Sequence, residues 1–166
     1  SALVVLFLFT AKAVTIQTQP AATLSVTGGL KFKLADHYLL LQGDYQLEAQ
    51  AEGYYPLSET IAIADEQNQT LSFELEKLPG HLTINTPGIN APVIIDQSAA
   101  GNTNQEIRDI AAGTHHLLIS AERYFPHEQS LEITGLDTAQ SLTLSLEPAW
   151  ADVSFSTQPQ GATLFV

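Results

Sequence analysis

The chain has 166 residues, with 18 acidic and 6 basic side chains, and its formal net charge is −12 at pH 7. This charge makes non-specific binding to nucleic acid or to anionic lipid head groups unfavourable. Cysteine is absent, which excludes disulfides, thiol catalysis and thiolate metal sites.

An unbroken apolar run, ALVVLFLF, occupies residues 2–9. It is too short to span a bilayer, which takes about 20 residues. We expect residues 1–13 to be the end of a membrane anchor or, as a second possibility, of a signal peptide, because Ala11-Lys12-Ala13 has the small-x-small pattern of a cleavage site. A buried edge strand is the third possibility, but the run lacks the alternation of the later strands. Both preferred interpretations predict export to the periplasm or cell surface.

Two segments recur after residue 13. Val14–Thr18 returns as Leu82–Thr86 and again as Val153–Thr157, and Gly43–Pro56 returns as Gly113–Pro126. The nearly constant spacing of about 70 residues predicts a tandem array of small domains. We assign residues 14–80 to repeat 1, 81–150 to repeat 2 and 151–166 to the start of a truncated repeat 3.

Apolar and polar residues alternate through both complete repeats, as in half-buried strands, and turn residues separate the runs. No stretch of helical period is long enough to compete. Short strands with closely spaced turns predict an all-β chain of tandem small antiparallel β-sandwich domains, preceded by the end of an N-terminal hydrophobic helix. The expected core positions in repeat 1 are Val14, Ile16, Leu24, Val26, Tyr45, Leu47, Ala49, Ala51, Ile61, Ile63, Leu71, Phe73 and Leu75. Those in repeat 2 are Leu82, Ile84, Val93, Ile95, Leu117, Ile119, Ala121, Leu131, Ile133, Leu142, Leu144 and Leu146.

The repeats resemble the PEGA domain. Pro159–Ala162 reads Pro-Gln-Gly-Ala, and Gly53-Tyr54 supplies the Gly-Tyr step that follows an alternating strand in this family. Repeat 2 departs from the pattern, with Arg123-Tyr124 at the Gly-Tyr step. The resemblance covers residues 14–166 as three short, degenerate copies in register. It implies an extracytoplasmic β-sandwich module without known catalysis, commonly placed between a membrane anchor and another domain of bacterial envelope proteins.

Paired aromatic residues are the strongest repeated side-chain feature. They are Tyr54-Tyr55 in repeat 1 and Tyr124-Phe125 in repeat 2. Adjacent residues of a strand face opposite ways, so one ring of each pair is expected in the core and the other outside. Tyr55 and Phe125 are therefore candidate ligand-binding residues that could stack on a sugar. Packing within and between domains is the preferred interpretation of the same pairs.

No other pattern predicts chemistry. His115 and His116 are neighbours on a strand, so their side chains point apart and cannot share one metal ion, and no zinc-site spacing is present. Asp65, Glu66 and Asn68 could offer oxygen ligands to calcium, but the segment lacks the regular spacing of such a loop. Nucleophile elbows and phosphate loops are absent. We expect no catalytic residues, metal or cofactor in this stretch, which is predicted not to be an enzyme.

The sequence therefore predicts a non-catalytic extracytoplasmic spacer or binding module that presents a downstream domain and is anchored by a single N-terminal transmembrane helix. Envelope glycan or another envelope protein is the expected partner, nucleic acid is excluded, and contact with the membrane is expected through the anchor only. Two alternatives stay open. One is an accessory region of an envelope enzyme, with a domain similar to the formylglycine-generating enzyme downstream. The other is a carbohydrate- or peptidoglycan-binding module.

Overall fold

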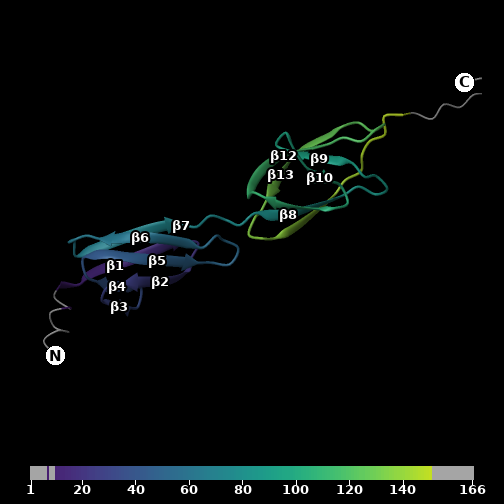
Figure 1. Cartoon of the computed structure of the whole chain (residues 1–166). Helices are drawn as coiled ribbons and strands as arrows, with labels where there is room; N and C mark the ends of the chain where they lie inside the picture. The colour runs from purple at the N-terminus through teal and green to yellow at the C-terminus, as the bar shows by residue number, and fades with distance from the viewer. Residues whose placement is uncertain (1–6, 8–9, 151–166) are drawn as a thin grey trace, which may run out of the picture. The chain divides into compact units, whose positions relative to one another are not determined.

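The computed structural model describes residue 7 and residues 10–150, and nearly all of its regular structure is β-strand (Figure 1). The predicted all-β class is therefore confirmed. The first seven strands are β1 (Lys12–Gln19), β2 (Thr23–Gly28), β3 (Lys31–Leu34), β4 (His37–Leu40), β5 (Gly43–Gln50), β6 (Leu57–Ile63) and β7 (Asn68–Glu74). The next seven are β8 (Gly80–Asn85), β9 (Pro92–Ile95), β10 (Ser98–Asn102), β11 (Glu106–Ile110), β12 (Gly113–Ile119), β13 (His127–Ile133) and β14 (Ala139–Thr143).

Strands β1 to β7 form a first sandwich of two sheets, with the strand orders β3-β4-β1-β7 and β2-β5-β6. Most neighbours are antiparallel, as predicted. The first and last strands are an exception, because β1 and β7 pair in parallel from Ala13↔Asn68 to Gln19↔Glu74. The chain therefore enters this sandwich at one end of the pair and leaves it at the other.

The core of the first sandwich lies where the alternation predicts it. Nine buried side chains form one cluster, with Leu24, Leu71 and Phe73 partly buried against it. Seven of the nine are among the predicted core positions, and the other two, Tyr38 and Leu40, lie on β4. The nine are Val14, Ile16, Val26, Tyr38, Leu40, Tyr45, Leu47, Ile61 and Ile63.

Strands β8 to β14 form a second pair of sheets, with the orders β10-β9-β12-β13 and β11-β8-β14. This arrangement repeats the first sandwich except for the third strand. In the first sandwich β3 pairs with β4, whereas in the second β10 pairs with β9. Asp96 and Gln97 join β9 to β10 with φ values of 48° and 67°, the left-handed conformation of a tight two-residue hairpin. This turn therefore places the third strand in the other sheet.

The second sandwich has a core of its own, with two fully buried threonines beside it. Thr86 and Thr103 are both 0% exposed, and their hydroxyl groups donate to the Ile89 carbonyl over 2.7 and 3.2 Å. The Asn104 amide donates to the same carbonyl over 2.6 Å and accepts from the Thr86 N–H over 2.9 Å. This network fixes the loop between β8 and β9. The buried apolar residues are Leu82, Ile84, Ala91, Val93, Ile95, Ile107, Ile110, Leu117, Ile119, Ile133 and Leu146.

The predicted hydrophobic helix and the third repeat fall largely outside the described residues. Of residues 1–13, Phe7 and Thr10 are helical and the Ala11 N–H donates to the Phe7 carbonyl over 2.8 Å, while β1 already begins at Lys12. Residues 151–166 are not described. Among the described residues, no helical segment has the length and apolarity that a bilayer crossing requires.

The chain divides into two compact units. Among the described residues, the first unit holds those up to His81 together with Arg108–Gly113 and Ile133–Ala139. The second unit holds Leu82–Ile107, Thr114–Glu132 and the residues from Gln140 onward. The predicted boundaries at residues 80 and 150 stay predictions.

Candidate functional site

The first candidate residue, Tyr55, lies just after a tight turn at the end of β5. The Tyr54 N–H donates to the Ala51 carbonyl over 3.2 Å, and Gly53 has a φ of 77°, which favours glycine. Tyr54 then forms an isolated antiparallel bridge with Lys77, and the Tyr55 N–H donates to the Glu76 carbonyl over 2.8 Å. These backbone bonds hold the segment that carries both rings.

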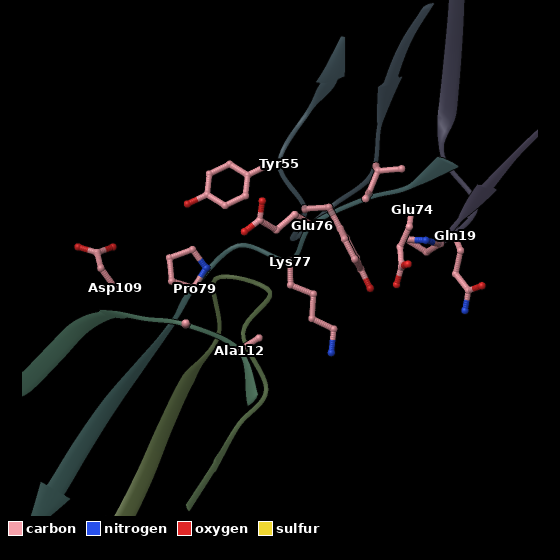
Figure 2. A pocket seen from close by; sticks show the side chains of 12 residues that line it. Gln19, Tyr55, Glu74, Glu76, Lys77, Pro79, Asp109 and Ala112 are labelled. Atoms are coloured by element: carbon pink, nitrogen blue, oxygen red, sulfur yellow. The ribbon is translucent and has the colours of Figure 1, made fainter. Parts of the chain in front are cut away.

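The two tyrosine rings differ in exposure, but neither lies in the core, where one ring of the pair was predicted. Tyr54 is half-buried, whereas Tyr55 is 46% exposed. Both belong to the lining of an open hollow of about 1020 Å³ in the first compact unit. Figure 2 shows the Tyr55 ring pointing away from Gln19 and Glu74. The other lining residues are Pro20, Leu75, Glu76, Lys77, Pro79, Asp109, Ala111 and Ala112.

The second candidate residue, Phe125, follows the same kind of turn at the end of β12. The Tyr124 N–H donates to the Ala121 carbonyl over 3.1 Å, Tyr124 bridges to Pro148, and the Phe125 N–H donates to the Glu147 carbonyl over 2.9 Å. Tyr124 is half-buried and Phe125 is 53% exposed. The equivalent of Gly53 here is Arg123, with a φ of 68°.

Trp150 is a neighbour of this turn that sequence reasoning missed. Its ring meets the Tyr124 ring edge to face, with centroids 5.0 Å apart and an interplanar angle of 81°. Trp150 is itself 50% exposed, so it adds a second exposed aromatic surface beside Tyr124. The available signal was that the chain's single tryptophan follows directly on the Pro148-Ala149 boundary.

Tyr55 and Phe125 lie on separate turns in different units. Each turn is thus a site of its own, with one exposed ring and one half-buried ring. An exposed aromatic face of this kind can stack on the apolar face of a sugar. Their assignment as ligand-binding residues stays a prediction.

The paired histidines contact different partners. The His115 Nδ1 lies 2.6 Å from the Asp96 Oδ2, whereas the His116 side chain lies toward Glu128, with Nε2 and Oε2 3.8 Å apart. The Asp96 Oδ1 accepts the His116 N–H over 2.8 Å. This backbone bond, aided by the bond to His115, lowers the pKa of the Asp96 carboxyl. The cluster fixes the β9–β10 turn onto β12.

The acidic turn before β7 is held by a buried lysine. The Lys12 Nζ lies 2.8 Å from the Asp65 Oδ1, and the hydrogen bond to Lys12, with its charge, lowers the pKa of the Asp65 carboxyl. Gln69 closes the same turn, because its side-chain amide accepts from the Ala64 N–H over 3.2 Å and donates to the Ala64 and Glu66 carbonyls over 3.0 Å. Across the described part of the chain, no group of three or more His, Asp or Glu side chains is arranged to hold a metal ion.

Comparisons with known proteins match one family. The family model described as the PEGA domain matches residues 80–149. Among solved structures, the chain is similar to the TIE protein of Bacillus anthracis, with 12% identity and a TM-score of 0.40. The match covers 83% of this chain and 34% of the TIE chain, so this chain spans about a third of that length. A search of curated protein sequences gave no match.

Proposed function

Because residues 80–149 form a PEGA domain, a family of non-catalytic modules, we propose that this chain is an extracytoplasmic spacer of a bacterial cell-envelope protein that holds a downstream domain away from the membrane. The proposal includes anchoring by the N-terminal apolar run, residues 2–9. The acidic side chains are spread along the chain, and a surface with this net charge of −12 helps to keep an exported protein soluble.

One structural observation favours a spacer over a compact docking module. In the first sandwich the terminal strands β1 and β7 run parallel, so the chain enters at one end of the sheet and leaves at the other. A strand of 8 residues such as β1 extends roughly 25 Å. Each repeat built in this way carries the chain forward by about a strand length, whereas an antiparallel terminal pair would return it to its starting side.

An export reporter tests the location. Alkaline phosphatase, which needs the oxidising periplasm to form its disulfides, is fused after Val166, and activity is measured in bacterial cells. We expect an active reporter when the fusion is made in the protein's own gene, and an inactive one when the apolar run, residues 2–9, is removed. Reporter activity that is absent from both fusions, with both proteins present in the cytoplasm, would contradict the proposal.

A second candidate function is binding of envelope glycan by the exposed rings. The exposure of Tyr55 and Phe125 at equivalent turns, with Trp150 also exposed in the second unit, favours it. Each stacked sugar ring would use the apolar face that an aromatic side chain offers.

The glycan hypothesis is tested by pull-down on purified peptidoglycan with the Tyr55→Ala/Phe125→Ala double variant. Phe32→Ala is the matched control, because Phe32 is 55% exposed but lies on β3, away from these turns in the chain. Binding is expected to fall at least about tenfold in the double variant, at unchanged thermal midpoint, and to persist in the control. Failure of the unmodified chain to bind would remove glycan as a ligand and leave the spacer proposal standing.

A further inference from the structure

We propose that the first sandwich is a mechanical clamp, in which the parallel β1–β7 pair resists tension applied along the chain. This inference goes beyond the spacer role, since it concerns force and depends neither on export nor on a ligand. It follows from where the chain enters and leaves the sheet.

The β1–β7 pair is in register over seven residue pairs, from Ala13↔Asn68 to Gln19↔Glu74. Two further hydrogen bonds close it. At the start of β1 the Ala13 N–H donates to the Gln67 carbonyl over 2.8 Å, and at the end of β7 the Leu75 N–H donates to the Gln19 carbonyl over 2.9 Å. Force on the chain pulls β1 at its first residue and β7 at its last, at opposite ends of the pair.

This geometry loads the pair in shear. The strands can separate only by sliding along each other, so the hydrogen bonds between them are strained together. In an antiparallel pair pulled at adjoining ends, the bonds instead break one after another. Forced unfolding is governed by the unfolding barrier, which is higher when many interactions must break in the same step.

Packing holds β1 against sliding as well. β1 is an inner strand between β4 and β7, and its side chains Val14 and Ile16 are 0% and 8% exposed in the core. Moving β1 along its axis withdraws these side chains from their contacts, which costs hydrophobic and dispersion energy in addition to the hydrogen bonds. The Lys12–Asp65 ion pair at 2.8 Å further ties the start of β1 to the turn before β7.

The second sandwich repeats the arrangement. Its first strand β8 lies between β11 and its last strand β14. The His81 N–H donates to the Thr138 carbonyl and the Leu144 N–H donates to the Asn85 carbonyl, both over 2.9 Å. The two bonds advance in the same direction along both strands, as in a parallel pair.

Force spectroscopy on the full chain tests the clamp by comparing two pulling directions. The chain has no cysteine, so introduced cysteines give unique handles. Thr10→Cys with Glu76→Cys loads β1–β7 in shear. The second pair of handles is Asp44→Cys with Ala62→Cys. These two residues are exposed and directly opposite each other near one end of the antiparallel β5–β6 pair, so pulling on them separates the two strands from that end, one hydrogen bond after another. At equal pulling speed we expect the unfolding force to be at least about twofold higher in shear. Equal forces, or a lower force in shear, would overturn the clamp.

Two proline variants separate mechanical from thermal stability. Ala13→Pro removes the N–H that donates to Gln67, whereas Ala62→Pro perturbs the β5–β6 pair. We expect both to lower the thermal midpoint, but only Ala13→Pro to lower the shear force, toward the value for peeling. An equal loss of shear force in both variants would contradict the clamp. If Ala13→Pro does not fold, the comparison of the two pulling directions in the unmodified sandwich still tests the clamp. The export reporter tests the spacer proposal separately.

Discussion

At the scale of single residues, the clearest feature is an arginine in a backbone conformation that suits glycine. Arg123 has a φ of 68°, and the equivalent turn in the first sandwich has Gly53 at 77°. A residue with a Cβ is disfavoured in this left-handed region by about 1–2 kcal/mol, and glycine is not. Part of this gain is offset by the greater freedom of glycine in the unfolded chain.

Arg123→Gly is therefore expected to raise the free energy of unfolding by roughly 0.5–1 kcal/mol, measured by urea denaturation. Arg123→Ala is the control, because it removes the same charge but keeps a Cβ. It should give no gain. Equal stabilisation by both variants would show that charge, rather than backbone conformation, is the cause.

Asp96 gives the fold a dependence on acid pH. Its carboxylate accepts the His116 N–H and faces the His115 ring, and these contacts lower its pKa in the folded state. A carboxyl whose pKa is lower when folded stabilises the fold above its unfolded pKa of about 3.9. That stabilisation is lost as the pH falls through the lower folded pKa, because the folded state then takes up the proton as well.

Asp96→Asn keeps an oxygen acceptor and tolerates a positive φ, so it removes chiefly the charge. We expect the variant to be less stable than the unmodified chain at pH 7, and the difference to shrink as the pH falls below about 4. Urea denaturation at pH 7 and at pH 3 measures the free energy of unfolding of the variant and of the unmodified chain. Asp44→Asn, at an exposed carboxylate of β5, controls for general loss of a negative charge. A difference that is the same at both pH values would contradict the role of the Asp96 charge.

At the scale of elements, the edge strand β3 is exposed along its whole length and alternates lysines with large apolar side chains. Leu30, Phe32 and Leu34 are each more than half exposed. The Lys31 Nζ instead donates to the Val26 carbonyl, and the Lys33 Nζ lies 5.4 Å from the centre of the Tyr38 ring. Lysine on an edge strand opposes pairing with another edge, because pairing would bury the charge.

Lys31→Val with Lys33→Val is therefore expected to make the chain self-associate through β3. Sedimentation velocity over a concentration series measures this. Lys77→Val is the control, since Lys77 is exposed and lies outside the named strands. A double variant that sediments like the unmodified chain at every concentration would show that the lysines do not protect this edge.

At the scale of the whole molecule, each sandwich contains fully buried side chains of its own. Leu47 in the first and Leu117 in the second are both 0% exposed and occupy equivalent strands, β5 and β12. Truncating such a leucine costs about 2–5 kcal/mol, because it leaves a cavity.

Leu47→Ala is therefore expected to speed hydrogen exchange in peptides from β5 and β6 while leaving exchange in β12 and β13 nearly unchanged. Leu117→Ala is the reciprocal control and should reverse the pattern. Mass spectrometry of exchanged peptic peptides measures both. Acceleration of exchange in both sandwiches by either variant would show that the two unfold as one cooperative unit.

Local pattern was enough to predict most of the strands and the exposed rings. Alternation of period two marks one face of each strand directly, so residues such as Leu47 and Leu117 could be placed in the core without knowing their partners. The Gly-Tyr step of the first repeat suggested the PEGA resemblance for the same reason, since turns depend on neighbouring residues. The exposure of Tyr55 and Phe125 follows from their position beside a half-buried ring.

Pairing between distant strands was decided by the tertiary structure. Ile107 and Ile110 of β11 are both buried although three positions apart, because Asp109 has a φ of 58° and breaks the alternation that reveals a strand. The contact of Trp150 with Tyr124 and the parallel pairing of β1 with β7 likewise join residues far apart in the sequence. Where the alternation is unbroken, the sequence thus determined which residues face inward, by a local rule. Which strands meet depends on how all the strands share one core, and only the folded chain decides it.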